Sequence, residues 1–122
     1  MTSIPRPTDA ELAILRVLWD RGPSTVRQVF EVLSAERDLG YTTVLKMLQI
    51  MDEKGLVVRD GSERTHVFRA RRSRGDTQRD LVGDLLDKAF GGSAKGLVLQ
   101  ALAARRTSPE DLAEIRRLIE QA

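Results

Sequence analysis

The stretch from Tyr41 to Gly55 constrains the fold of this 122-residue chain more than any other, because it predicts one helix with two different faces. At about 3.6 residues per turn, one face carries an apolar stripe of Val44, Met47, Leu48 and Met51. The opposite face is polar, is flanked by Thr43 and Ile50, and consists of Thr42, Lys46, Gln49 and Glu53. Gly55 is expected to end the helix as its C-terminal cap. Such a helix is either an ordinary surface helix or a recognition helix that presents its polar face to DNA.

Two further helices are expected before this one, each beginning at a capping box. The boxes pair Thr8 with Glu11 and Thr25 with Gln28. The apolar faces of these helices are expected to be buried, and consist of Leu12, Leu15, Leu18 and Trp19 in the first and Val26, Val29, Phe30 and Leu33 in the second. The polar segment 35–40 predicts a turn. A helix, a short connection and an amphipathic helix with a polar outer face are typical of a helix-turn-helix.

A β-hairpin of the wing type is expected after the helix that ends at Gly55, with strands at residues 56–59 and 64–69 and a turn at residues 60–63. Arg64 and Thr65 would then lie at or just past the hairpin tip, where side chains can contact the DNA backbone or the minor groove. The single histidine, His66, has no metal-binding residue at ligand spacing. It is therefore expected on the wing surface, with neither a metal nor a catalytic role.

Positive charge gathers in one part of the chain, although the formal net charge is only +2. Residues 59–79 contain seven arginines and three acidic residues, whereas the residues after Arg72 contain eight basic and eight acidic ones. A local excess of this kind is either an electrostatic footprint for phosphates or a solvated arginine-rich linker. The pattern alone favours neither.

Several classes of function are disfavoured by what the sequence lacks. It has no cysteine, which excludes disulfides, Cys-type zinc sites and thiol catalysis and is compatible with a reducing cytoplasm. It has no Gly-rich phosphate loop and no Ser/His/Asp set, so we expect no catalytic residues, no cofactor and no enzyme. No apolar run approaches bilayer length, and residues 1–5 lack a signal-peptide core, so we expect a cytoplasmic protein without membrane insertion.

The composition changes at residues 71–75, which predicts two domains, residues 1–72 and residues 73–122. Three helices are expected in the second domain, capped by Ser73, Ser93 and Ser108. About fifty residues in three helices cannot bury a full core alone. We therefore expect this half to dimerise with another copy of the chain, through an apolar stripe that includes Leu81, Leu85, Leu97, Leu112, Ile115 and Ile119.

Several short motifs together resemble the penicillinase-repressor family, also called BlaI/MecI/CopY. The most specific are Tyr-Thr-Thr-Val at residues 41–44, Glu-Lys-Gly-Leu-Val at residues 53–57 and Phe-Gly-Gly-Ser at residues 90–93. Leu18-Trp19, Gly22-Pro23, Thr25-Val26-Arg27 and Arg64 also match the family pattern. The resemblance runs from about Thr8 to the last expected helix, which is nearly the whole chain.

The resemblance implies a mostly α-helical protein with a winged helix-turn-helix domain, a small β-hairpin wing and a three-helix dimerisation region. It implies a homodimeric transcriptional repressor on inverted-repeat operators with TACA/TGTA-like half-sites, whose Thr42, Thr43 and Lys46 meet DNA with Arg64 and Thr65 on the wing. An inducing signal such as proteolysis would release the repressor, with a membrane metalloprotease as regulatory partner. The copper-responsive branch of the family uses C-terminal cysteines, and this chain has none.

The sequence therefore predicts a DNA-binding repressor whose contacts come from one helix and one wing. The predicted DNA-binding residues are Thr42, Thr43, Lys46, Gln49, Ile50, Arg64 and Thr65. Ile50 is either a stray surface residue or a contact to a thymine methyl group, and we favour the contact. A winged helix that serves as a protein-interaction adapter is the alternative function, and it would need no basic outer face.

Overall fold

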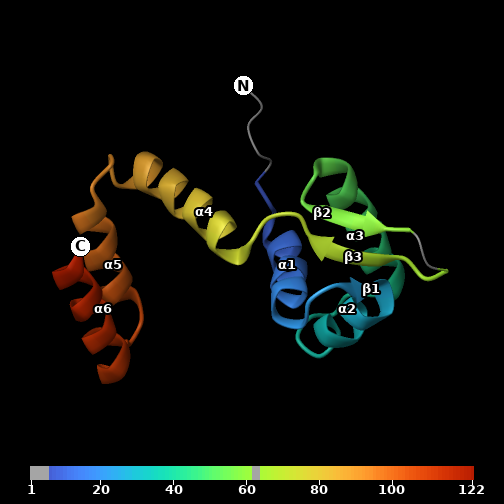
Figure 1. Ribbon diagram of the computed structural model, residues 1–122, viewed down its shortest axis with the longest axis horizontal. Coiled ribbons are helices and arrows are strands. Elements are labelled where there is room, and N and C mark those ends of the chain that lie inside the picture. The colour runs from blue at the N-terminus through green and yellow to red at the C-terminus, as the bar shows by residue number, and fades with distance from the viewer. Residues whose placement is uncertain (1–5, 62–63) are drawn as a thin grey trace. The chain divides into compact units, whose positions relative to one another are not determined.

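The computed structural model describes residues 6–61 and 64–122, which form two compact units that meet in sequence between Leu81 and Val82. The chain is mostly helical with one small sheet, as predicted (Figure 1). The helix α4 (Arg74–Ala89) contributes residues to both units. The predicted domain boundary, between residues 72 and 73, lies just before this helix, and a division of function at that point stays a prediction.

Three helices of the first unit form where the sequence predicts them: α1 (Asp9–Arg21), α2 (Val26–Leu33) and α3 (Tyr41–Lys54). Both predicted capping boxes are present. The Thr8 hydroxyl accepts a hydrogen bond from the Glu11 N–H at 3.1 Å, and the Thr25 hydroxyl accepts one from the Gln28 N–H at 3.2 Å. Gly55 ends α3 in the left-handed conformation with φ of 84°, which costs glycine little because it has no Cβ.

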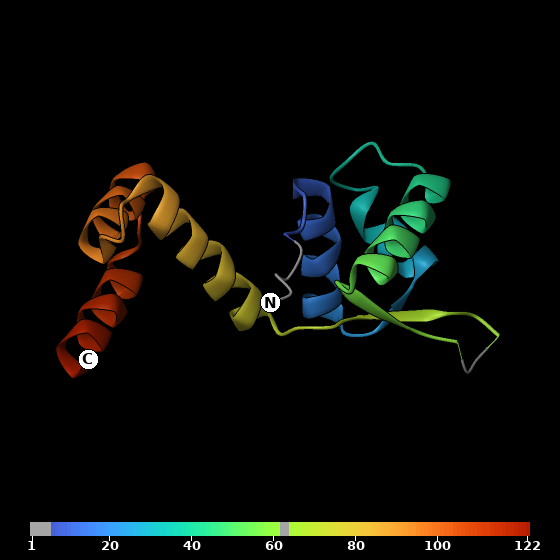
Figure 2. The same cartoon turned by 90° about the horizontal axis from the view of Figure 1, so that it is seen from above.

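The apolar faces of α1, α2 and α3 meet in one core that also includes the sheet. Its fully buried large side chains come from all of these elements and are Ile14, Val29, Leu33, Val44, Leu48, Met51, Val57 and Phe68. Burying a side chain of this size stabilises the fold by about 1.5–3 kcal/mol. Figure 2 shows the three helices on one face of the sheet, so this core fixes how α3 is presented.

The sheet has three antiparallel strands, not the two of the predicted hairpin: β1 (Ser24–Thr25), β2 (Val57–Asp60) and β3 (Val67–Ala70), in the order β1-β3-β2. The sequence pattern at Thr25 indicated only the start of a helix. Thr25 is the N-cap of α2, and it also pairs with Val67 in the sheet, next to the pair of Ser24 with Phe68.

The prediction of a second strand at residues 64–69 was wrong at both ends. Pairing between β2 and β3 runs from Val57–Ala70 to Asp60–Val67, so Arg64, Thr65 and His66 lie in the wing loop. These three side chains are exposed and have no strand opposite them to pair with. Residues 62 and 63 of the predicted turn lie outside the described residues.

The start of α4 is held against α1 within the first unit. The Trp19 indole N–H donates a hydrogen bond to the Arg72 carbonyl at 3.0 Å, and the Arg74 guanidinium lies 5.8 Å from the centre of the indole ring. Arg74 also forms an ion pair with Asp20. Trp19 is half-buried and packs against the core, so it anchors this junction as well as the core.

The second unit contains the end of α4, α5 (Ala94–Ala104) and α6 (Pro109–Gln121). Ser93 and Ser108 cap α5 and α6 as predicted, each hydroxyl accepting an N–H from the first turn at 3.0 Å. Gly91 and Gly92 both have positive φ and separate α4 from α5. None of residues 82–122 is buried, so the helices of this unit enclose no core of their own.

Candidate nucleic-acid interface

The outer face of α3 is polar and open to solvent, as the sequence predicts. Val44, Leu48 and Met51 are fully buried beneath it, which fixes the rotation of the helix about its axis. Every predicted DNA-binding residue of the helix is exposed, and these are Thr42, Thr43, Lys46, Gln49 and Ile50. The helix can therefore present this face to a ligand without rearranging its core.

The N-terminus of α3 differs from those of α1 and α2 in its cap. Its N-cap residue is Gly40, which offers no side-chain acceptor for the first-turn N–H groups. Those N–H groups and the hydroxyls of Thr42 and Thr43 lie together at the positive end of the helix. Hydrogen-bond donors in this arrangement suit a phosphate oxygen.

The C-terminal end of α3 forms an ion pair with α1 that was not predicted from the sequence. Lys54 Nζ lies 2.9 Å from Glu11 Oε2 and 3.2 Å from Glu11 Oε1. Glu11 is buried although it is charged, and it also accepts the Thr8 N–H at 2.9 Å. The (i, i+3) spacing revealed the capping box, but a pair separated by 43 residues has no local pattern.

Burial of Glu11 acts to raise the pKa of its carboxyl group. The hydrogen bond from the Thr8 backbone and the hydrogen bond and charge of Lys54 outweigh this effect, so the net pKa of Glu11 lies below its ordinary value. The carboxylate is therefore the favoured form in the folded protein.

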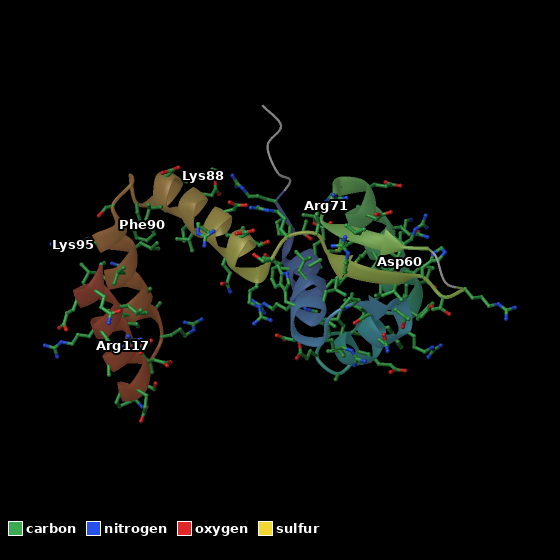
Figure 3. All side chains as sticks on the ribbon, viewed as in Figure 1. Asp60, Arg71, Lys88, Phe90, Lys95 and Arg117 are labelled. Carbon is green, nitrogen blue, oxygen red and sulfur yellow. The ribbon has the colours of Figure 1, made fainter. Side chains whose placement is uncertain are left out.

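Arg64 and Thr65 lie in the wing loop, exposed, between β2 and β3. The loop begins after Asp60, which is labelled at the end of β2 (Figure 3). Within the described residues no carboxylate forms an ion pair with Arg64 or with its neighbour on β2, Arg59. The wing therefore carries positive charge that is available to an external anion.

A cleft of about 460 Å³ lies between the start of α2, the helix α3 and the wing. Three predicted DNA-binding residues, Gln49, Arg64 and Thr65, contribute to its walls. Two further arginines line it, Arg27 and Arg59, and neither is among the predicted DNA-binding residues. The predicted contacts thus gather at the wing and along α3, with the cleft between them.

The predicted dimerisation residues are exposed or half-buried in the single chain. Leu85, Leu112 and Ile119 are exposed, while Leu81, Leu97 and Ile115 are half-buried. Further exposed apolar side chains lie outside the predicted set in the second unit, and these are Val82, Val98, Leu99, Leu102 and Leu118. The unit therefore exposes more apolar surface than the predicted set alone.

The part of the chain that the structure describes meets neither the requirement of a metal cluster nor that of a helix that crosses a membrane. Over residues 6–61 and 64–122, no three His, Cys, Asp or Glu side chains are grouped so that they could hold a metal ion. In the same residues, no helix is both long enough and apolar enough to cross a bilayer.

A helix-turn-helix with an exposed polar second helix and an adjacent wing defines a winged-helix DNA-binding protein. The sequence model described as "Penicillinase repressor" matches residues 7–121. The chain therefore belongs to the penicillinase repressor family, whose members are DNA-binding transcriptional repressors and not enzymes. This membership confirms the resemblance seen in the sequence and the predicted class of function.

Two curated relatives align over nearly the full chain. The Mycobacterium tuberculosis transcriptional regulator BlaI is 36% identical over 121 residues, which cover 98% of this chain and 88% of the relative. The Bacillus licheniformis penicillinase repressor is 24% identical over 121 residues, covering 99% of this chain and 94% of the relative.

Solved structures of BlaI resemble part of the chain. The solution structure of monomeric Bacillus licheniformis BlaI with the blaP half-operator has a TM-score of 0.54 and 26% identity, covering 62% of this chain and 93% of that one. A solution structure of the DNA-binding domain of the repressor BlaI matches with the same TM-score and coverage. These likenesses confirm the predicted winged helix-turn-helix.

Proposed function

We propose that this protein is a cytoplasmic, homodimeric repressor that binds an inverted-repeat operator with TACA/TGTA-like half-sites and so excludes RNA polymerase. The observation that carries the proposal is the polar face of α3, which is exposed beside a wing whose Arg59 and Arg64 form no ion pair with the described residues, while its opposite face is fixed in the core. An adapter that binds only proteins would not need this basic surface.

The proposed contacts divide between positioning and reading of DNA. Thr42 and Thr43, at the uncapped N-terminus of α3, bind phosphate oxygens. Lys46 and Gln49 lie along the same exposed face and reach base edges in the major groove. Arg64 and Thr65 contact the DNA backbone or the minor groove from the wing.

The solved complex of Bacillus licheniformis BlaI with a half-operator supports the proposal that each chain binds one half-site. In that structure, Bacillus licheniformis BlaI binds the blaP half-operator as a monomer. A full operator would then hold two chains related by a two-fold axis, because the symmetry of an inverted repeat mirrors that of a dimer. The M. tuberculosis relative is likewise named a transcriptional regulator.

The second unit supports dimerisation through another copy of the same chain. It has no buried residue, yet its helices expose eight large apolar side chains. A soluble monomer rarely leaves so much apolar surface uncovered. A second copy presents the same surface, so an isologous contact would cover both at once.

Release of the operator follows an inducing signal such as proteolysis within the second unit. A cut there would separate the DNA-binding unit from the surface proposed to join two chains. A membrane metalloprotease is the proposed regulatory partner. Co-expression of the repressor with a candidate protease, followed by mass spectrometry of the repressor, tests this step. Full-length repressor recovered after induction would contradict it.

The main experiment selects DNA with the full-length protein from a random-sequence duplex pool, followed by fluorescence anisotropy and sedimentation on the selected duplex. We expect an inverted repeat bound by two chains. A chain shortened to residues 1–81, which keeps the contacts of Trp19 with Arg72 and Arg74, is expected to be monomeric and to bind the duplex much more weakly. Binding without any sequence preference would favour the adapter.

A further inference from the structure

The cleft between α2, α3 and the wing has arginines in its walls that the proposed contacts leave largely unused. Its volume is about 460 Å³, and three of its lining residues are arginines, Arg27, Arg59 and Arg64. Only Arg64 belongs to the proposed interface. Among the described residues, no carboxylate forms an ion pair with any of the three.

Arg27 is exposed, but its guanidinium lies over the ring of Tyr41. Its guanidinium carbon lies 5.4 Å from the ring centre of Tyr41, the first residue of α3. The Tyr41 ring in turn meets the half-buried Phe30 edge-on, with ring centres 5.8 Å apart and planes at 76°. A cation–π contact of this kind restricts the guanidinium without neutralising its charge. Arg27 therefore faces the cleft as a positioned cation.

Arg59 lines the cleft from the sheet. It lies on β2, where it pairs with Phe68 across the ladder, and its side chain is exposed. It also borders a second hollow beside Gln49, Asp52 and Glu53, yet it forms no ion pair with either acid. The cleft is thus lined by cations from α2 and from the sheet, and by Gln49 of α3.

The geometry of B-form DNA places a backbone strand over this cleft. In the proposed complex α3 enters the major groove, while the wing reaches toward the adjacent minor groove. Neighbouring grooves are separated by one sugar–phosphate strand. That strand must therefore pass between α3 and the wing, which is where the cleft lies.

We infer that the cleft is a seat for phosphates of this strand, with Arg27 and Arg59 as phosphate-binding residues and Tyr41 as the residue that positions Arg27. The inference rests on the proposed function and extends it to two arginines outside the helix face and the wing loop. Contacts of this kind set the register of the protein on DNA and carry no base specificity.

The first test measures the salt dependence of DNA binding by the full-length variants Arg27→Gln and Arg59→Gln. The probes are the duplex selected by the wild-type protein and a scrambled duplex of the same length. Each variant is expected to flatten the log–log salt slope by about 0.9, because one phosphate contact is lost. The affinity that each variant loses relative to wild type should therefore be roughly fivefold larger at about 0.15 M salt than at about 1 M salt, in parallel for both duplexes.

The matched control is Arg16→Gln. Arg16 is an exposed arginine on α1 without an ion pair to the described residues, and it borders a hollow beside Trp19 instead of the cleft. Its replacement is expected to leave the salt slope unchanged. If Arg16→Gln flattened the salt slope as much as Arg27→Gln and Arg59→Gln do, the assignment of the phosphate contacts to the cleft would be wrong.

The second test locates the phosphates. Duplexes are prepared with a single neutral methylphosphonate at successive backbone positions. Wild-type protein is expected to lose affinity at specific phosphates between the α3 and wing contacts. Arg27→Gln and Arg59→Gln should each lose sensitivity at one of them. Variants that keep the full wild-type pattern of sensitivity would contradict the proposed seat.

The third test separates positioning from direct contact at Tyr41. Tyr41→Phe keeps the aromatic face, so the replacement Arg27→Gln should weaken binding in this variant as much as in wild type. Tyr41→Ala removes the face, and adding Arg27→Gln should then weaken binding little further. Equal effects of Arg27→Gln in all three backgrounds would remove the positioning role.

The outcomes distinguish this inference from the proposed function. If the wild-type protein selects no duplex, the proposed function fails and the inference fails with it. If a duplex is selected but Arg27→Gln and Arg59→Gln keep the wild-type salt slope, the inference alone is wrong. Unfolding by urea, followed by the fluorescence of Trp19, the single tryptophan, confirms that each exposed arginine was replaced without loss of the fold.

Discussion

Arg64 is the wing residue with the clearest expected effect on DNA affinity. Its side chain is exposed in the wing loop and forms no ion pair with the described residues. Replacing it with alanine should flatten the log–log salt slope by about one unit, because a single phosphate contact disappears. Affinity for the selected and scrambled duplexes should fall by a similar factor. An unchanged slope in an anisotropy titration would remove Arg64 from the contacts.

Ile50 stands out on α3 because it is an apolar side chain on the polar face, and 40% of it is exposed. The change Ile50→Ala is expected to cost about 1 kcal/mol of operator affinity, mainly at one A·T pair, by removing a contact to a thymine methyl group. The fold should be retained, because an exposed side chain contributes little to the core. Binding to the selected duplex measures the loss.

Uracil provides the control for Ile50, because it lacks the methyl group of thymine and pairs in the same way. Wild-type protein should lose affinity when one particular thymine is replaced by uracil. Ile50→Ala already lacks the contact to the methyl group, so the same replacement should lower its affinity little. If both proteins lose equally at every substituted position, Ile50 contacts no methyl group. It is then an ordinary surface residue.

At this scale, helical periodicity was enough to predict which side chains of α3 face outward. Thr42, Thr43 and Lys46 are exposed because Val44 and Leu48 must be buried. Periodicity could not reveal that Arg27 lies over a ring of another helix, because that contact depends on how α2 approaches α3 across the turn. The exposure of the α3 side chains was thus predictable from the sequence, and the position of Arg27 beside them was not.

At the scale of elements, the Glu11–Lys54 pair fixes the end of α3 to α1. The pKa of Glu11 is lowered in the folded state, so the carboxylate stabilises the fold above its ordinary pKa of about 4.3. That stabilisation is lost as the pH falls through the lowered pKa, where the folded protein also takes up the proton. The pair therefore contributes near neutral pH and not in strong acid.

The change Glu11→Gln tests this link. Near neutral pH it should lower the free energy of unfolding by about 1 kcal/mol, since the Thr8 hydrogen bond survives and only the charge is lost. This loss is small for a carboxylate as buried as that of Glu11, because its partner Lys54 is 38% exposed and water screens the charge of the pair. Urea unfolding followed by Trp19 fluorescence measures the difference, which should shrink toward zero at a pH below about 4.

Glu31→Gln is the matched control for Glu11→Gln. Glu31 lies on the exposed face of α2, and its carboxylate forms no ion pair with the described residues. Its replacement should change the free energy of unfolding by less than about 0.5 kcal/mol at any pH. If Glu31→Gln matched Glu11→Gln in size and pH dependence, the effect would come from net charge and not from the pair.

Local sequence signals predicted the helices better than the strands. A capping box or a terminal glycine acts within a few residues, so the helix starts at Thr8 and Thr25 and the stop at Gly55 were all predictable. A two-residue strand such as β1 exists only because β3 lies beside it. Its pairing joins residues more than forty positions apart, and no local pattern carries that information.

Across the whole chain, the second unit is the part that does not bury its apolar side chains by itself. Its length alone predicted that three helices would not close a core, and none of residues 82–122 is buried. Of the apolar side chains that the sequence assigned to dimerisation, Leu85, Leu112 and Ile119 are exposed in the single chain. The sequence could not predict which of them meet in an assembly, because that depends on the geometry of a second chain.

Ile119 is the most exposed of these side chains, and 62% of it is accessible in the single chain. An aspartate at this position meets water in the monomer, so the fold of the chain should survive. In a dimer it would bury a carboxylate against apolar surface from the partner chain, which is strongly unfavourable. Ile119→Asp should therefore raise the dimer dissociation constant by at least about tenfold, equivalent to about 1.4 kcal/mol.

Sedimentation equilibrium of the full-length protein measures this constant, with Ile50→Asp as the matched control. Ile50 is also an exposed isoleucine, but it lies on α3 in the DNA-binding unit. Ile50→Asp should keep the wild-type dissociation constant while it weakens operator binding. Ile119→Asp should weaken operator binding only as far as the dimer is lost, so higher protein concentration should restore it. A dimer that tolerates Ile119→Asp would place the contact between chains on another surface.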